Sequence, residues 1–363
     1  MPNPLVECIP NFSEARRPEV VDAIINAIKS VPGIHVLDLH SDLDHNRSVV
    51  TFIGSPASVE EAAYQGILKA SQLIDLNVHT GEHPRIGAAD VVPFVPISQI
   101  SMQECVEMAR RLGERVGREI AIPVYLYEEA ATRPERQNLE NIRRGQYEGL
   151  KSEIGINPNR DPDFGPAEVG PAGATVIGAR QPLIAFNVFL TTNDTGIAQK
   201  IARAIRNSSG GLRYVKAMGV SVEGHAQVSM NLINYRQSPI ARTVEMIRRE
   251  AARYGVGIER SELVGLIPQE ALVNAAKWYL QLDDLDANQI LENRLFEQVS
   301  EGIEPLSDTT SDDFLENLAS AEPPPAGGSA AAYTCAAAAA LVVMAARITI
   351  GKKKYQAYED QMV

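Results

Sequence analysis

The feature that most limits the fold of this chain is one order of secondary structure that occurs twice. Apolar residues recur with the spacing of strands and amphipathic helices, and they predict β-α-β-β-α-β in residues 5–95 and again in residues 183–266. Helices in this order pack on one face of an antiparallel sheet. We therefore expect an α+β fold with two ferredoxin-like β-α-β-β-α-β sandwiches in tandem. The two halves show no similarity residue by residue, so the duplication is inferred from element order alone.

The individual elements follow from the same patterns. In the first half we expect strands at residues 5–10, 34–39, 49–53, 91–95 and 123–127, and helices at residues 17–30, 58–73 and 102–116. In the second half we expect strands at residues 183–190, 212–221, 226–232 and 257–266, and helices at residues 194–206, 239–253 and 268–280. An alanine-rich helix is expected from residue 330 to about residue 350.

Glycines and prolines mark the boundaries between the parts of the chain. Residues 155–173 contain four glycines and four prolines, which exclude regular structure there. Such a segment is either disordered or a ligand-binding loop, and its place between the two halves favours the loop. We expect subdomains at residues 1–181 and 182–303, a polar linker at residues 304–312, and a C-terminal helical segment at residues 313–363.

The composition is that of a globular protein, because 45% of the 363 residues are hydrophobic and 22% are charged. The net charge of −12 disfavours nucleic acid as a partner. Cys8, Cys105 and Cys335 are far apart and lack a metal-binding spacing, which is typical of a reducing compartment. Residues 330–346 approach the length of a membrane span, but their alanines favour helix packing over lipid. With no signal-peptide pattern at the N-terminus, we expect a cytoplasmic protein without membrane contact.

A polar loop at residues 79–87 carries the first candidate for chemistry. His83 lies between Glu82 and Arg85, glycines close both ends of the motif, and Pro84 excludes a helix. An imidazole with a pKa of about 6.5 both takes and gives a proton near neutrality. The sequence therefore predicts that His83 is a general acid and base.

Six motifs in chain order resemble glutamate formimidoyltransferases. They lie at residues 5–13, 46–49, 81–85, 123–127, 163–166 and 178–180. The C-terminal segment resembles the beginning of a formimidoyltetrahydrofolate cyclodeaminase, at residues 314–315, 325–329 and 349–355. The residues to which the deaminase activity of that family is ascribed would follow Val363, so we expect no deaminase activity from this chain.

The resemblance implies transfer of a formimidoyl group from N-formimidoyl-L-glutamate to N5 of tetrahydrofolate, a reaction of histidine degradation. In such enzymes the histidine of the Gly-Glu-His-Pro-Arg loop is the catalytic acid and base, and it corresponds to His83. Tetrahydrofolate is then a co-substrate, and a homodimer or higher homo-oligomer is expected. The family's folate loop corresponds to these residues: Gly165, Pro166, Ala167, Glu168, Val169, Gly170, Pro171, Ala172 and Gly173.

The implied chemistry needs carboxylates and arginines beside the histidine. The amidine of the donor is protonated at neutral pH, so its positive charge calls for a carboxylate. We expect three carboxylates in this role: Glu7, Asp42 and Asp44. Both substrates carry carboxylates, which arginines bind as bidentate forks. We expect three arginines in this role, each of which is alternatively a partner in a surface ion pair: Arg47, Arg85 and Arg180.

Several alternatives remain at this level. The carboxylate that orients His83 is undecided, because His40 stands where related enzymes carry an aspartate. His40, His45, His79 and His83 alternatively form a metal site, but they lack a metal-binding spacing, and we expect no metal. The alternative functions are an enzyme of the same family that acts on 5-formyltetrahydrofolate and a non-catalytic folate-binding module.

Overall fold

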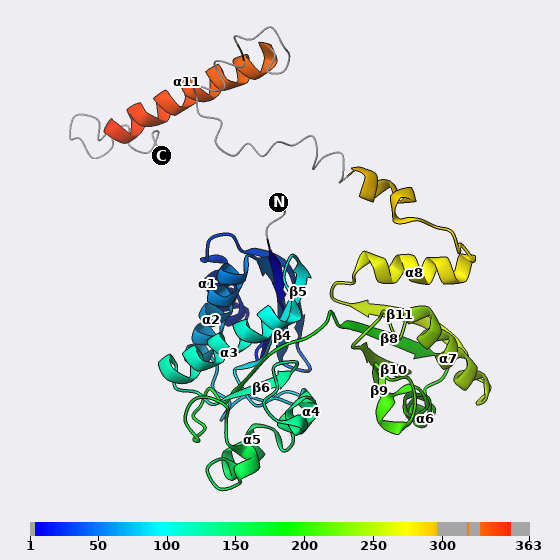
Figure 1. Cartoon of the computed structure of the whole chain (residues 1–363). Helices are drawn as coiled ribbons and strands as arrows, with labels where there is room; N and C mark the ends of the chain where they lie inside the picture. The colour runs from blue at the N-terminus through cyan, green and yellow to red at the C-terminus, as the bar shows by residue number, and fades with distance from the viewer. Residues whose placement is uncertain (1–3, 296–317, 319–326, 350–363) are drawn as a thin grey trace. The chain divides into compact units, whose positions relative to one another are not determined.

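The computed structural model describes residues 4–295, residue 318 and residues 327–349, and it contains two β-sheets with helices (Figure 1). Residues 1–283 and residues 284–363 form separate units, and both sheets belong to the first unit. The chain is therefore of mixed α+β class, as expected.

The first sheet has seven strands in the order β3-β4-β1-β5-β7-β6, with β2 following β1 between β4 and β5. Its strands have these bounds: β1 (Leu5–Cys8), β2 (Asn11–Phe12), β3 (His35–Asp42), β4 (Arg47–Gly54), β5 (Ala89–Ser98), β6 (Val124–Glu128) and β7 (Thr175–Ala179). The helices of this half are α1 (Pro18–Lys29), α2 (Pro56–Leu73), α3 (Met102–Glu119), α4 (Leu139–Ile142) and α5 (Gln146–Glu153), with 3-10 turns η1 (Pro134–Arg136) and η2 (Pro158–Arg160).

Contrary to the expectation, the first sheet is not antiparallel throughout, because its β5, β7 and β6 strands are parallel. β3, β4, β1 and β5 are antiparallel neighbours, but β7 pairs parallel with both β5 and β6. Parallel strands need a crossover connection, and α3 supplies it between β5 and β6. The sequence analysis missed β7, because its five residues end in Gly-Ala beside a glycine-rich segment and carry no clear alternation.

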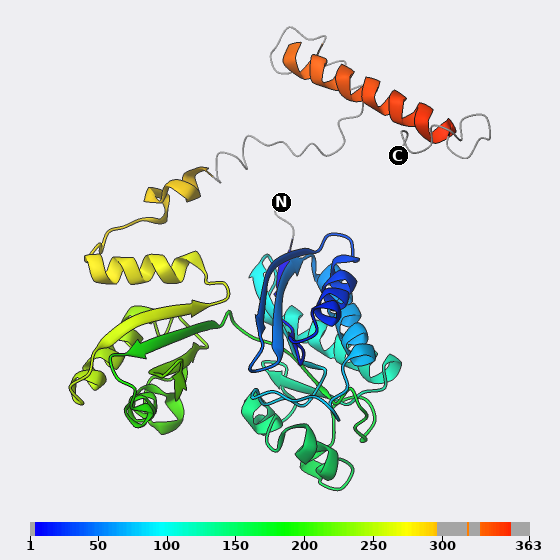
Figure 2. The same cartoon turned by 180° about the vertical axis from the view of Figure 1, so that it is seen from behind.

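The long helices cover one face of the first sheet. Figure 2 shows α1 and α2 together on one side of the blue strands, and α2 and α3 pack on the sheet itself. Val6, Cys8 and Phe52 are fully buried in the core that these helices share with the sheet. Because side chains alternate along a strand, Glu7 and Arg47 point to the opposite face. Polar groups are therefore concentrated on the face away from the helices.

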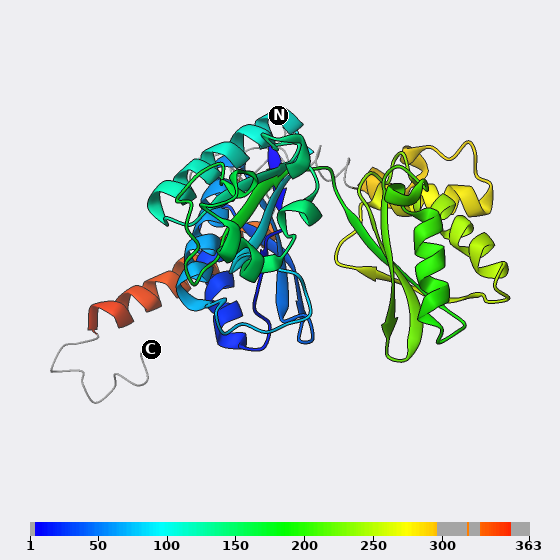
Figure 3. The ribbon, with the colours of Figure 1, turned by 90° about the horizontal axis from the view of Figure 1, so that it is seen from below.

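The second sheet is antiparallel throughout, in the order β11-β8-β10-β9. Its strands are β8 (Ile184–Leu190), β9 (Val215–Val222), β10 (His225–Leu232) and β11 (Ile258–Val264). Its helices are α6 (Thr195–Ile205), α7 (Ile240–Ala252) and α8 (Gln269–Leu280), with the 3-10 turn η3 (Asn207–Ser209). Figure 3 shows the green helix α6 along the strands, and α8 packs on α7. The element order from β8 to β11 is the predicted one.

In the second unit the structure describes the 3-10 turn η4 (Ala287–Gln289) and the helix α11 (Gly327–Thr349). The predicted alanine-rich helix is confirmed, although it begins earlier, at Gly327. None of the helices in the described part of the chain combines the length and the hydropathy that a membrane span requires. The predicted linker at residues 304–312 and the motif at residues 314–315 lie outside the described residues, as does most of the motif at residues 349–355.

Candidate functional site

The loop that carries His83 is fastened to the turn between β3 and β4. Gly81 permits this contact, because a Cβ added there would lie only 2.4 Å from the carbonyl oxygen of His45. The backbone N–H of Glu82 donates to the carbonyl of Asp44 at 3.2 Å, and the Asn46 side chain donates to the carbonyl of Thr80 at 2.9 Å. The loop is thus held at the end of the polar face of the first sheet.

His83 is half-buried, and both of its ring nitrogens are engaged. Its Nε2 accepts a hydrogen bond from Nη1 of Arg47 at 2.7 Å, and the backbone carbonyl of Pro84 accepts from the other ring nitrogen. The ring of His45 meets the His83 ring edge-to-face, with centroids 6.0 Å apart. The arrangement selects the neutral tautomer that has a lone pair on Nε2.

The surroundings of His83 disfavour its protonated form. Burial, followed by the positive charges of Arg47 and Arg143 and by His45, lowers the pKa of His83 to about 2. The sequence-based expectation of an imidazole titrating near 6.5 is therefore wrong for the free protein. At neutral pH His83 is therefore a neutral base, and its one ring proton is donated to the carbonyl of Pro84.

Arg143 belongs to this site, and the sequence analysis missed it. Its Nη2 pairs with Oδ2 of Asp90, and the two side chains are 15% and 3% exposed. The other carboxylate oxygen of Asp90 accepts from the backbone N–H of Ile86 at 2.7 Å. Arg143 follows the four-residue helix α4, in a segment where we expected no element, so no periodic pattern indicated it.

The three candidate carboxylates do not contact His83. Asp42 instead binds His45, with 2.6 Å between Oδ2 and Nδ1. Burial alone would raise the pKa of Asp42, but the hydrogen bonds from His45 outweigh it and lower that pKa. Asp44 is exposed and offers its backbone carbonyl to the His83 loop. Glu7 lies on β1 near Arg180, and burial raises its pKa against the opposing charge of that arginine.

The three candidate arginines occupy different surroundings. Arg47 lies at His83, as described, and its Nη1 also donates to Oδ1 of Asn11 at 3.3 Å. Arg180 is half-buried and lies within hydrogen-bonding reach of Tyr127, whose pKa is raised by burial to about 12. Arg85 is buried, with 6% of its surface exposed, and it forms a bidentate ion pair with Glu148 at 2.8 and 3.0 Å. The contacts of Arg85 are those of a side chain that holds its loop to α5.

The glycine-rich segment meets the His83 loop at one end only. Gly173 bridges Gly87, and the N–H groups of Ala88 and Ala174 donate to the carbonyls of Ala172 and Ile86 at 2.8 Å each. Residues 165–168 are exposed. The structure thus brings the two loops of the resemblance together along residues 86–88 and 172–174.

The histidines give no support for a metal centre. Among residues 4–295 and the described part of the tail, no group of three or more His, Cys, Asp or Glu side chains is placed to hold a metal ion. Nδ1 of His79 accepts from Nε of Arg85 at 3.2 Å, and burial lowers the pKa of His79. His40 is exposed on β3, opposite Val49 of β4.

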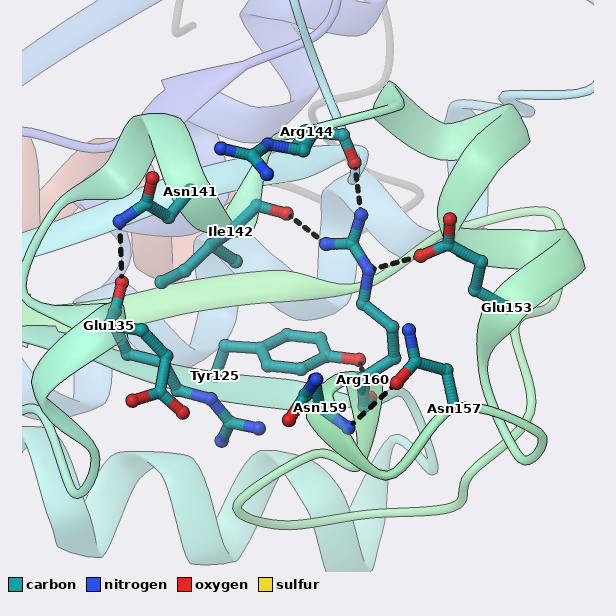
Figure 4. A pocket seen from close by; sticks show the side chains of 10 residues that line it. Tyr125, Glu135, Asn141, Ile142, Arg144, Glu153, Asn157, Asn159 and Arg160 are labelled. Atoms are coloured by element: carbon teal, nitrogen blue, oxygen red, sulfur yellow. Dashed lines mark hydrogen bonds and ion pairs between the residues drawn. The ribbon is translucent and has the colours of Figure 1, made fainter.

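An open pocket of about 690 Å³ lies elsewhere, between β6 and the segment that contains η1, α4, α5 and η2 (Figure 4). Two of its three arginines, Arg136 and Arg160, are paired within the protein. Arg160 pairs with Glu153 at 2.6 Å and donates to the carbonyls of Ile142 and Arg144, and Arg136 pairs with Asp163 at 2.7 Å. His83 is not part of its lining.

Comparisons with known proteins place the whole chain in one context. Models of the formiminotransferase domain match residues 5–180, as its N-terminal subdomain, and residues 185–304. A formiminotransferase-cyclodeaminase model matches residues 310–363.

Curated relatives agree with these models. Glutamate formimidoyltransferase of Streptococcus pyogenes serotype M1 is 50% identical over 295 residues, which are 80% of this chain and 98% of that protein. Glutamate formimidoyltransferase of Thermoplasma acidophilum is 51% identical over 295 residues, with 80% and 97% covered. Formimidoyltransferase-cyclodeaminase of Dictyostelium discoideum is 38% identical, with 99% of this chain and 73% of that protein covered. At this identity and coverage, the chain belongs to the glutamate formimidoyltransferase family.

Proposed function

We propose that this protein transfers the formimidoyl group of N-formimidoyl-L-glutamate to N5 of tetrahydrofolate, giving 5-formimidoyltetrahydrofolate and L-glutamate. The observation that carries the proposal is His83, a neutral imidazole with its Nε2 lone pair among arginines, in a chain that belongs to this family. Tetrahydrofolate is the co-substrate, and the reaction belongs to histidine degradation.

The proposed roles follow from what each group offers. His83 accepts the proton that N5 loses on attacking the amidine carbon, and it then delivers a proton to the departing glutamate nitrogen. Its low pKa in the free protein makes it a base first, so the proton it later donates is the one it has taken from the substrate. Arg47 and Arg180 bind substrate carboxylates, whereas Arg85 supports the loop through Glu148.

The carboxylates and the folate loop complete the proposed site. Glu7, Asp42 and Asp44 supply negative charge for the amidinium, with Asp42 acting through His45. Residues 165–173 bind the folate, and their contact with residues 86–88 links that loop to His83.

The division of the chain into parts is proposed from its membership of this family. Residues 1–181 and 182–303 are the two subdomains, each with a ferredoxin-like β-α-β-β-α-β unit that β6 and β7 extend in the first. Residues 304–312 are the linker, and residues 313–363 are a cyclodeaminase-like helical segment. We further propose a cytoplasmic homodimer or higher homo-oligomer.

A turnover assay tests this function. Purified protein is mixed with tetrahydrofolate and formimidoylglutamate, and 5-formimidoyltetrahydrofolate is followed by its absorbance. Product formation is the expected result. Tight folate binding without turnover would instead favour a non-catalytic folate-binding module, and turnover of 5-formyltetrahydrofolate with ATP would favour the other enzyme of the family.

A further inference from the structure

The site around His83 has more buried positive than negative charge. Burial, and after it the nearby positive charge of Arg143, lower the pKa of Arg47 against the weaker opposing charges of Asp90 and Asp42. Arg143 has Asp90 as its partner, but Arg47 donates only to the amide oxygen of Asn11 and to the neutral ring of His83. A buried charge without a counter-ion is unfavourable, so one negative charge is missing here.

Unused hydrogen-bond donors lie in the same place. Among the described residues, buried side-chain nitrogen atoms without a hydrogen-bond partner occur on two side chains, Nε of Arg47 and Nε of Arg143. Nearly all buried polar groups in proteins have partners, so orphaned donors on two neighbouring guanidinium groups indicate an absent acceptor. A carboxylate fits both the missing charge and the fork geometry of arginine.

The hydrogen bond from Arg47 to His83 links these unpaired donors to the proposed base. Nε2 is the only ring nitrogen of His83 with a lone pair, and Nη1 of Arg47 occupies it. We propose that a substrate carboxylate binds between Arg47 and Arg143 and draws Arg47 away from Nε2 of His83, which frees this nitrogen for the proton of the attacking amine. That the carboxylate belongs to a substrate rests on the proposed function. That an anion binds here rests on the two arginines alone.

The groups that face His83 are consistent with such a switch. Arg47 comes from β4, His45 from the β3–β4 turn, Arg143 from the end of α4, and the carbonyl of Pro84 from the loop itself. The nearest carboxylates are committed, Asp42 to His45 and Asp90 to Arg143. A bound carboxylate would therefore pair with Arg47 and Arg143 alone. Its negative charge would raise the pKa of His83.

Binding without turnover tests the site. The histidine rings are followed by long-range ¹H–¹⁵N NMR, with L-glutamate and, separately, p-aminobenzoyl-L-glutamate as probes, and the His83→Gln variant identifies the signal. We expect saturating probe to shift the Nε2 signal of His83 and to make this ring titrate at higher pH. A response to L-glutamate places the amino-acid carboxylate in the site, and a response only to p-aminobenzoyl-L-glutamate places the folate tail there. No response to either overturns the proposal.

Two variants with opposite expected effects on probe affinity give a second test, measured by calorimetry. Arg47→Gln should weaken probe binding about 10-fold to 100-fold. Asp90→Asn should strengthen it, because the amide oxygen still accepts from Ile86 while the charge that competes for Arg143 is gone. Arg111→Gln, which removes an exposed partner of Glu60, is the matched control and should bind like wild type. Equal affinities across all four proteins overturn the proposal, whereas lack of turnover by wild type with these differences intact overturns only the proposed function.

Discussion

Two histidines of the His83 loop, His79 and His83, each accept a hydrogen bond from an arginine, yet the two arginines have opposite surroundings. Arg85 donates to His79 at 3.2 Å and to both oxygens of Glu148, so its charge is fully met. Arg47 donates to His83 at 2.7 Å and has no carboxylate partner among the described residues. Arg85 is buried and Arg47 is half-buried, and only Arg85 has a carboxylate partner in the portion that the structure describes.

This difference separates an arginine that holds structure from one that awaits a ligand. A paired, buried guanidinium stabilises the fold, and its removal leaves its partner unsatisfied. An unpaired, buried guanidinium costs stability and persists where function uses it. Burial alone, or membership of one motif, does not distinguish the two.

The largest expected effect concerns His83 itself. His83→Ala should lower kcat by about 10²-fold to 10⁴-fold, the usual contribution of a positioned acid and base. His225→Ala is the matched control, because His225 is a partly exposed histidine that pairs with Glu259 in the second sheet. Steady-state kinetics on formimidoylglutamate measure both. If the two variants were equally active, His83 would have no part in the chemistry, and the hydrogen bond from Arg47 would have no catalytic meaning.

The next effect separates the two arginines. Arg85→Met should lower the free energy of unfolding by about 2 kcal/mol and Tm by about 4–8 °C, because bonds to a charged partner are lost, with little change in the KM for formimidoylglutamate. Arg47→Met should raise that KM about 10-fold to 100-fold and leave Tm unchanged or higher, because it removes a buried charge without a counter-ion.

Thermal unfolding and kinetics on the same preparations check this pair of predictions. A Tm loss in Arg47→Met, or a KM increase confined to Arg85→Met, would reverse the two roles. Glu148→Gln should reproduce part of the Tm loss of Arg85→Met, since Glu148 supplies the other half of that ion pair.

How far the sequence predicts this fold depends on whether an element carries its own pattern. The helix α1 buries Val20, Val21, Ile24, Ile25 and Ile28 with helical spacing, so it was predicted. The short strand β7 has all five of its residues buried and therefore no alternation to detect. The pairing of β7 between β5 and β6 depends on contacts between residues distant in sequence. The mixed character of the sheet depends on the same contacts.

The site divides in the same way. His83 and Arg47 lie in motifs, and the structure brings them within hydrogen-bonding distance. Arg143 lies 60 positions further along the chain than His83. Its ion pair with Asp90 brings it to the site. The role of Asp42 also depended on folding, because the register that sets it opposite Arg47 turns its carboxylate to His45 instead of His83.

A smaller effect concerns the contact that places the loop. Gly81→Ala should lower kcat about 10-fold, because the added Cβ meets the carbonyl of His45 and displaces His83 from Arg47. Gly257→Ala is the matched control, since a Cβ there meets Thr191 at an ordinary 3.7 Å. Kinetics of both variants decide the matter, and unchanged kcat in Gly81→Ala would mean that the loop position is set elsewhere.

The smallest effect is the dependence of stability on pH that His83 contributes. The pKa of His83 is about 2 in the folded protein and about 6.5 when unfolded, so below pH 6.5 the unfolded chain binds the additional proton. The free energy of unfolding must then fall as the pH falls. Between pH 7.5 and pH 5.5, urea unfolding should show wild type losing about 1 kcal/mol more than His83→Gln. Equal losses would mean that His83 is not held neutral by Arg47 and Arg143, and the contrast with the paired Arg85 would then have no electrostatic basis.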